Sequence, residues 1–141
     1  MIVLIRHGST QANEHHLYCG STDLPLSQAG REALQGLHYD FGGIRFITSG
    51  MKRTNETLKL LFGPMQYEIR PEFREINFGA FEMKSYEMLR DDPAYQVWIT
   101  GDNERNVPPG GESGEQMKKR VLAAFGALEQ ERVDTVLITH G

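Results

Sequence analysis

Two short apolar runs, one near each end of the chain, constrain the fold most. Ile2–Ile5 is β-branched and lacks the alternation of a half-buried strand, and Asp134–Thr139 is continuously apolar in its middle. Each run therefore predicts a strand buried on both faces. Weaker strand patterns occur at Ile44–Thr48 and Tyr67–Arg70, and helical patterns separate the four. Strands that alternate with helices predict a mostly parallel central sheet in a three-layer α/β/α sandwich.

Helices are expected in five places. Ser27 is a suitable N-cap for a helix with a stripe of Ala29, Ala33, Leu34 and Leu37. The remaining helices are expected at Met51–Phe62, at Lys84–Arg90, at Pro93–Ile99 and after the capping box of Ser113 and Gln116. Residues 72–82 are expected to be irregular, with aromatic side chains that fold back onto the body, and residues 101–111 to form a loop.

Length, charge and cysteine content exclude several classes of protein. A chain of 141 residues suits one domain, residues 1–141. The net charge is −4 and no run of Lys or Arg exceeds two residues, so a nucleic-acid partner is not expected. The apolar runs are too short to span a membrane, which argues against a membrane partner. The lone Cys19 excludes an internal disulfide and fits a reducing compartment, so we expect a cytoplasmic protein.

The first and fourth expected strands both end in His-Gly, at His7 and His140. In parallel sheets, ligands bind beyond the carboxyl ends of the strands. Arg6 precedes His7, and Arg53 follows the end of the second strand at the start of a helix. Two guanidinium groups and two imidazoles at one sheet edge indicate an anion site, because the planar fork of arginine matches pairs of phosphate oxygens.

Other kinds of site find little support. The phosphate-loop pattern, the dinucleotide-binding glycine pattern and the H-E-x-x-H metal motif are all absent. The adjacent pair His15-His16 is typical of a solvated loop, because neighbouring side chains rarely aim at one ion. No metal and no cofactor is therefore expected.

Six blocks of sequence resemble, in order, the motifs of the histidine phosphatase superfamily, which has the phosphoglycerate-mutase-like fold. The blocks are Leu4-Ile5-Arg6-His7-Gly8-Ser9-Thr10 with Asn13; Thr22-Asp23-Leu24-Pro25-Leu26-Ser27 with Gly30; Thr48-Ser49 with Arg53 and Thr57; Arg74-Glu75-Ile76-Asn77-Phe78-Gly79-Ala80-Phe81-Glu82; Gly111-Glu112-Ser113 with Arg120; and Thr139-His140-Gly141. A lone R-H-G would be weak support, but the ordered set is specific and covers the chain.

The resemblance implies a role for each site residue. His7 is the implied nucleophile, which forms a phosphohistidine, and Glu75 is the implied acid that protonates the leaving oxygen. The implied contacts to the phosphoryl oxygens come from Arg6, Arg53, His140, Asn13 and the backbone around Gly20. Two simpler interpretations stay open: Glu75 could be a surface acid paired with Arg74, and Arg53 an exposed helix residue.

The resemblance also bears on the reaction. The long insertion that mutases carry after the position of Glu75 is missing, which favours hydrolysis of a small phosphorylated metabolite without a metal ion. The pattern is most similar to the small branch that includes α-ribazole-5′-phosphate phosphatases and broad-specificity phosphatases. A phosphoglycerate mutase is the alternative enzyme, and a catalytically silent phosphate-binding domain is the alternative outside enzymes.

The end of the chain departs from the family pattern. Family members continue past the second His-Gly into a further helix and strand, so the fold is expected to be shortened at its C-terminus. Without that helix, one face of the fourth strand is expected to be left bare. The hypothesis is that the sequence is a truncated product, or that a neighbouring chain covers the gap, as in a homodimer.

Overall fold

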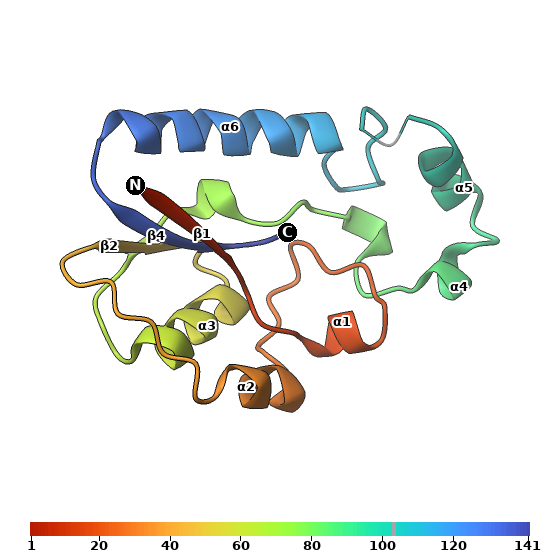
Figure 1. Cartoon of the computed structure of the whole chain (residues 1–141). Coiled ribbons are helices and arrows are strands. Elements are labelled where there is room, and N and C mark those ends of the chain that lie inside the picture. The colour runs from red at the N-terminus through yellow and green to blue at the C-terminus, as the bar shows by residue number, and fades with distance from the viewer. Residues whose placement is uncertain (103) are drawn as a thin grey trace.

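The computed structural model describes residues 1–102 and 104–141. Four parallel strands form one sheet in the order β1-β4-β2-β3. The strands are β1 (Ile2–Arg6), β2 (Arg45–Thr48), β3 (Glu68–Ile69) and β4 (Thr135–Thr139). The helices are α1 (Gln11–Glu14), α2 (Gln28–Leu34), α3 (Lys52–Phe62), α4 (Tyr86–Leu89), α5 (Pro93–Thr100) and α6 (Gly114–Gln130). In Figure 1, α6 covers one face of the sheet while α2 and α3 lie on the other, so the three-layer α/β/α prediction is confirmed.

Strand β4 lies in the middle of the sheet, and this explains its continuous apolar sequence. Val136, Leu137 and Ile138 are at most 1% exposed, so the expectation that one face of the fourth strand is left bare is wrong. Leu137 packs with Leu128 of α6, whereas Val136 and Ile138 pack with Leu58 of α3. Alternate side chains thus enter the two helical layers, as the parallel-sheet pattern requires.

The prediction that the first strand is buried on both faces is wrong. β1 is an edge strand that pairs only with β4 among the described residues. Val3 and Ile5 pack into the cluster on the α3 side, and Ile2 packs near α6. Leu4, on the same face as Ile2, is 57% exposed because no described element covers it there. An apolar strand sequence alone cannot distinguish a central strand from an edge strand of this kind.

Of the stripe expected for the helix after Ser27, only Leu34 is partly buried, and the other three positions are exposed. Ser27 is the N-cap, as expected, but α2 ends at Leu34, and Gly36 has a left-handed φ of 81°. Leu37 therefore lies outside the helix and is 43% exposed. Ala29 and Ala33 are exposed as well, whereas the face that packs inward contains Gly30. A Cβ on Gly30 would lie 2.1 Å from a backbone oxygen of the loop after β1, so only glycine allows this approach.

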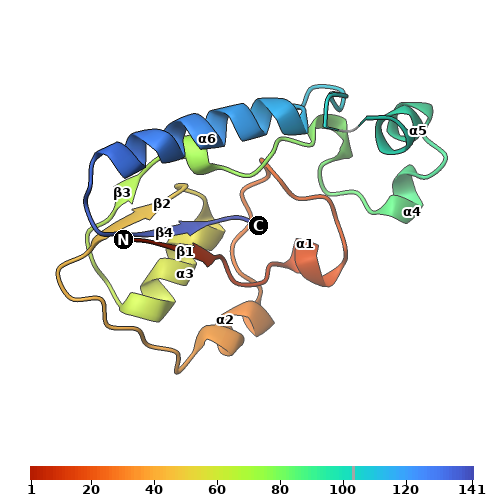
Figure 2. The same cartoon turned by 45° about the horizontal axis from the view of Figure 1, so that its top comes forward.

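Beyond the carboxyl ends of the strands, α4 and α5 form a separate small layer, as Figures 1 and 2 show. Phe81, Leu89, Tyr95 and Trp98 form its core, and Phe78 packs against them. Residues 72–82 are irregular apart from two short 3₁₀ helices, Pro71–Phe73 and Gly79–Phe81. The expectation that the aromatic residues of this segment fold back onto the body is confirmed for Phe73, which packs with Leu128 and Leu137, whereas Phe78 and Phe81 pack into the small layer instead.

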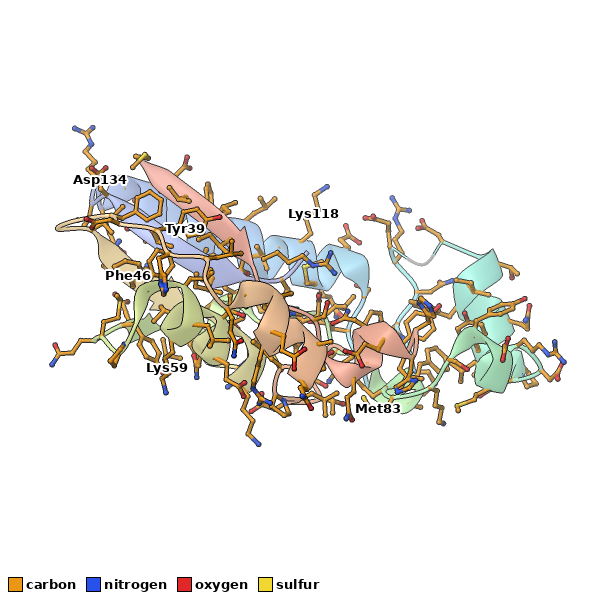
Figure 3. The ribbon with its side chains drawn as sticks, turned by 60° about the horizontal axis from the view of Figure 1, so that its bottom comes forward. Tyr39, Phe46, Lys59, Met83, Lys118 and Asp134 are labelled. Atoms are coloured by element: carbon orange, nitrogen blue, oxygen red, sulfur yellow. The ribbon has the colours of Figure 1, made fainter. Side chains whose placement is uncertain are left out.

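The opposite end of the sheet is closed by a second aromatic group. Tyr39, Phe41 and Phe46 gather around Phe62, the last residue of α3, and Figure 3 labels Tyr39 and Phe46 at this end. The two ends of the molecule are therefore built differently, because this aromatic group lies at one end and the two His-Gly turns lie at the other. In the described part of the chain, no helix has both the length and the apolar character needed to cross a membrane.

Candidate active site

The register of β1 and β4 places the two histidines side by side. Arg6 pairs with Thr139, and the His7 N–H donates to the Thr139 carbonyl oxygen at 3.0 Å. The centroids of the His7 and His140 rings lie 5.1 Å apart in an edge-to-face arrangement. The expected convergence of the two His-Gly turns therefore follows from two hydrogen-bonded strands that end at the same level.

The His7 ring is held in one tautomer. Its Nδ1 lies 2.6 Å from the Gly8 carbonyl oxygen, which can only accept, so Nδ1 carries the proton and Nε2 keeps its lone pair. Burial lowers the pKa of His7 to about 4, and the charges of Arg53 and Arg6 add to this, although the Gly8 hydrogen bond opposes it. His7 is therefore neutral at pH 7, the state that a nucleophile requires.

His140 is fixed from both sides of its ring. Nδ1 accepts a long hydrogen bond of 3.4 Å from Arg53 Nε, so Nε2 carries the proton and donates to Ser49 Oγ at 2.9 Å. Burial and then the Arg53 charge lower the pKa of His140 to about 3. Ser49 is fully buried and was not expected as a site residue. Its fixed spacing before Arg53 in the third sequence block is the one signal that could have pointed to this role.

Arg53 is a buried cation without a carboxylate partner. It is 1% exposed, which excludes the simpler interpretation as an exposed helix residue. Its Nη1 donates to the Thr22 carbonyl oxygen at 2.9 Å and its Nη2 to the Gly20 carbonyl oxygen at 2.8 Å. Among the described residues, neither Arg53 nor Arg6 forms a salt bridge. Because a buried charge normally requires a counter-charge, this site favours an anion.

A cavity of about 200 Å³ opens between these groups. It is lined by Arg6, His7, Thr10, Asn13, Leu17, Tyr18, Cys19, Arg53, Glu75, Phe78 and Gly141. Both arginines, His7 and Glu75 thus share one cavity. His140, which was expected to contact the phosphoryl oxygens, is not part of this lining and bonds to Arg53 instead. No group of three or more His, Cys, Asp or Glu residues in the described ranges is placed to hold a metal ion.

Glu75 faces this cavity and does not pair with Arg74, whose Nε is directed to the Ser49 carbonyl oxygen. Glu75 Oε1 accepts from the N–H of Ile76 at 2.9 Å. Burial raises the pKa of Glu75, and this outweighs the opposing effects of the hydrogen bond and the nearby arginines. A carboxyl group with a raised pKa can hold a proton closer to neutral pH, as a general acid must.

The structure places Asn13 at the cavity and Gly20 outside it. Asn13 Oδ1 accepts from the backbone N–H and the hydroxyl of Thr10, each at 2.9 Å, and this caps α1. Gly20 differs from expectation, because its N–H donates to Glu82 and its carbonyl oxygen accepts from Arg53. No backbone N–H of Gly20 is left for a phosphate. Its requirement is steric, since a Cβ there would lie 1.6 Å from the Ile76 carbonyl oxygen.

Glu82 is a site residue that the sequence reasoning missed. Its carboxylate accepts from the N–H groups of Gly20, Ser21 and Phe78 and from the Thr22 hydroxyl, at 2.8–3.2 Å. Burial alone would raise the pKa of Glu82, but these donors lower it overall. Glu82 therefore stays ionised and fixes the loop whose carbonyl groups hold Arg53. Its place at the end of the fourth sequence block was the available indication.

Thr57 was likewise quoted only as part of a block. It lies one turn after Arg53 on α3, and its hydroxyl accepts from the N–H of Gly8 at 3.0 Å while donating to the Arg53 carbonyl oxygen at 2.7 Å. The turn that carries His7 is thus tied to the helix that carries Arg53. Together these contacts give a rigid, positively charged cavity with a neutral imidazole nitrogen in it.

Comparison with known proteins agrees with this geometry. The profile of the histidine phosphatase superfamily (branch 1) matches residues 2–141. The chain is 34% identical to the adenosylcobalamin/alpha-ribazole phosphatase of Escherichia coli (strain K12), over 97% of this chain and 71% of that protein. It superposes on the alpha-ribazole phosphatase from Shigella flexneri with a TM-score of 0.85 at 30% identity, covering 99% of this chain and 72% of that one. A phosphoglycerate mutase from Thermus thermophilus superposes with a TM-score of 0.74 at 34% identity, covering 99% and 77%. The chain belongs to the histidine phosphatase superfamily, branch 1.

Proposed function

We propose that this chain hydrolyses phosphate monoesters through a phosphohistidine formed on His7. The single observation that carries the proposal is the uncompensated charge of Arg53, buried beside a neutral histidine whose free nitrogen faces the same cavity. A phosphate monoester supplies both the anion that Arg53 and Arg6 lack and the electrophile that His7 can attack. The similarity to proteins named phosphatases supports the same reaction.

In the first step, Nε2 of His7 attacks phosphorus. A P–N bond forms, the P–O bond to the alcohol breaks, and Glu75 gives its proton to the departing oxygen. Arg6, Arg53 and the amide of Asn13 bind the phosphoryl oxygens. His140, whose Nδ1 accepts from Arg53 Nε, holds this guanidinium toward the phosphoryl oxygens.

In the second step, a water molecule replaces the alcohol. Glu75, now ionised, takes a proton from this water, whose oxygen attacks phosphorus as the P–N bond breaks. Inorganic phosphate leaves, His7 returns to its neutral form and Glu75 is protonated again. Because the arginines supply the charge stabilisation, the proposed reaction is independent of metal ions and cofactors.

The proposed substrate is a small phosphorylated metabolite. The relatives' names make α-ribazole-5′-phosphate the first compound to test, with other monoesters beside it. The chain spans about seven tenths of the length of these relatives, so substrate choice is a proposal for the chain as given. We place the reaction in the cytoplasm, because the half-buried free thiol of Cys19 at the cavity suits a reducing compartment.

A phosphoglycerate mutase is the second candidate, because one solved structure similar to this chain bears that name. The two reactions share the phosphohistidine and differ in the acceptor. A mutase returns the phosphoryl group to its substrate and releases little phosphate, whereas a phosphatase passes it to water.

The test is turnover with and without His7. The wild-type chain is expected to release phosphate from monoesters in the presence of a chelator and to show a phosphoryl adduct in intact-mass analysis after rapid quenching in base. His7→Ala should lose at least ~10²-fold in turnover and the adduct as well. His38→Ala, at an exposed position, is the matched control. Interconversion of phosphoglycerates without phosphate release would favour the mutase. Absence of both activities and of the adduct would leave a phosphate-binding domain.

A further inference from the structure

Glu75 belongs to a segment with little secondary structure of its own. After the 3₁₀ helix Pro71–Phe73, residues 74–78 form neither helix nor strand. The histidines, by contrast, directly follow hydrogen-bonded strands. A proton donor must lie within hydrogen-bond reach of the leaving oxygen, so something outside the segment must hold Glu75 in place.

Arg120 of α6 holds the backbone immediately before Glu75. Its Nη1 donates to two carbonyl oxygens of the segment, that of Glu72 at 2.7 Å and that of Arg74 at 2.9 Å. One nitrogen thus bridges the residues three and one positions ahead of Glu75. The carbonyl group between them, that of Phe73, accepts from the Thr139 hydroxyl at 3.3 Å, at the end of β4.

Glu112 holds the backbone on the other side of Glu75. Its carboxylate binds Nη2 of Arg120 and accepts from the N–H of Asn77 at 3.2 Å. The N–H of Glu112 in turn donates to the Asn77 carbonyl oxygen at 2.9 Å. Both polar backbone groups two positions after Glu75 are therefore bonded to one residue. Arg120 and Glu112 form a continuous clamp across residues 72–77.

The clamp is anchored on the long helix α6. This helix begins with a full capping box at Ser113, directly after Glu112. Phe73, only 3% exposed, packs into the cluster with Leu128 and with Val121, which follows Arg120. Apolar packing thus fixes the start of the segment on α6, and the clamp fixes the part that carries Glu75. Neither Arg120 nor Glu112 lines the cavity, so both act through Glu75.

We propose that Arg120 and Glu112 are positioning residues, which hold the Glu75 carboxyl group where it can transfer a proton to and from the ester oxygen and water. This inference rests on the proposed phosphatase function and deepens it. It predicts that substitutions in the clamp lower the reaction rate most for substrates whose leaving group needs a proton. A merely structural role predicts equal damage to every substrate.

The experiment compares two substrates in the same variants. An alkyl phosphate has a poor leaving group and needs the proton, whereas p-nitrophenyl phosphate has a good leaving group and needs it little. For Arg120→Gln and Glu112→Ala, the single-turnover rate of phosphohistidine formation should fall by about 10- to 100-fold on the alkyl phosphate and by less than about 3-fold on p-nitrophenyl phosphate. This step is compared because the later attack of water uses Glu75 whichever alcohol has left. Both variants should still form the phosphohistidine on His7 from p-nitrophenyl phosphate.

Two further variants separate position from charge and from general stability. Arg120→Lys keeps the positive charge but not the rigid fork, so its loss on the alkyl phosphate should resemble that of Arg120→Gln. Arg31→Gln is the matched control, because it removes an arginine from the exposed pair with Glu56, at 2.8 Å, away from residues 72–77. Arg31→Gln should leave the rates on both substrates unchanged. The double variant Arg120→Gln/Glu112→Ala should lose no more than Arg120→Gln alone, because the two residues act as one unit.

Several results would overturn the inference. Equal losses of rate on both substrates would mean that the clamp only stabilises the fold. Wild-type rates in Arg120→Lys would mean that only the positive charge of residue 120 matters and not its hydrogen-bonding geometry. If Arg120→Gln failed to fold, Glu112→Ala and Arg120→Lys would decide by the same comparison. The proposed function fails separately, if the wild-type chain forms no phosphohistidine and turns over neither substrate.

Discussion

Acid should destabilise this protein through the two histidines at the cavity. Burial beside arginine lowers the pKa of His7 to about 4 and that of His140 to about 3, whereas a histidine in an unfolded chain has a pKa of about 6.5. Below pH 6.5 the unfolded chain therefore binds protons that the folded chain does not. The part of the free energy of unfolding that depends on these two histidines is therefore present in full above pH 6.5. It is lost as the pH falls toward 4 for His7 and toward 3 for His140.

The size of the effect follows from the same values. Between pH 7 and pH 5, a pKa of about 4 against one of about 6.5 removes about 2 kcal/mol from the free energy of unfolding. His140 contributes a similar amount, so the pair accounts for about 4 kcal/mol. This is a large part of the ~5–15 kcal/mol that stabilises an ordinary domain.

Urea unfolding at pH 7 and pH 5 measures this loss. Trp98 is 7% exposed and is the only tryptophan in the sequence, so its fluorescence reports unfolding. The loss of stability should be about 2 kcal/mol smaller in His7→Asn than in wild type. It should be about 4 kcal/mol smaller in His7→Asn/His140→Asn, while exposed His38→Asn serves as the control. Carboxyl groups titrate in all variants and largely cancel. A loss in His7→Asn equal to that of wild type would refute the reasoning.

Three further substitutions test the scaffold of the site. Gly20→Ala should lower the free energy of unfolding by at least about 2 kcal/mol in urea titrations, because its Cβ would lie 1.6 Å from a backbone oxygen. Gly42→Ala is the control and should change this free energy little, because its Cβ would have only one contact, at 3.9 Å. Glu82→Gln should cost about 1.5–3 kcal/mol at pH 7, read as a lower Tm, because charge-assisted hydrogen bonds to the loop are lost; an unchanged Tm would contradict the role of its carboxylate. Ser49→Ala should cost about 1–3 kcal/mol in urea titrations, since it leaves the buried N–H of His140 without its acceptor, and Ser49→Thr tests whether a hydroxyl restores it.

The sequence predicted the strand ends better than the helix faces. His7 and His140 each follow an apolar run, and parallel strands deliver their carboxyl ends to one edge, so the meeting of these two rings required only the fold class. The face of α2 could not be obtained in this way. It packs through Gly30, a residue without a side chain, so hydrophobic periodicity pointed instead to the exposed Ala29 and Ala33.

Edge position and indirect contacts were the other limits. Leu4 is exposed because of where β1 stands in the strand order, which depends on partners far away in sequence. The backbone around Gly20 was expected to contact a phosphate, yet the N–H of Gly20 is bonded to Glu82, 62 positions along the chain. Such pairings involve backbone atoms, which every residue has, so they cannot be predicted from residue types in the sequence.

The way in which Arg53 is held explains how a buried cation can stay available to an anion. A carboxylate in direct contact would stabilise the guanidinium but would also cancel the charge that a phosphate needs. Here carbonyl groups of Gly20 and Thr22 contact Arg53, and Glu82 binds the N–H groups and the hydroxyl of the same loop. The peptide group between Gly20 and Ser21 thus lies between the two charges, with its oxygen toward Arg53 and its N–H toward Glu82. Because this peptide group keeps Glu82 out of contact with Arg53, the charge of Arg53 stays uncompensated and the cavity keeps a net positive field.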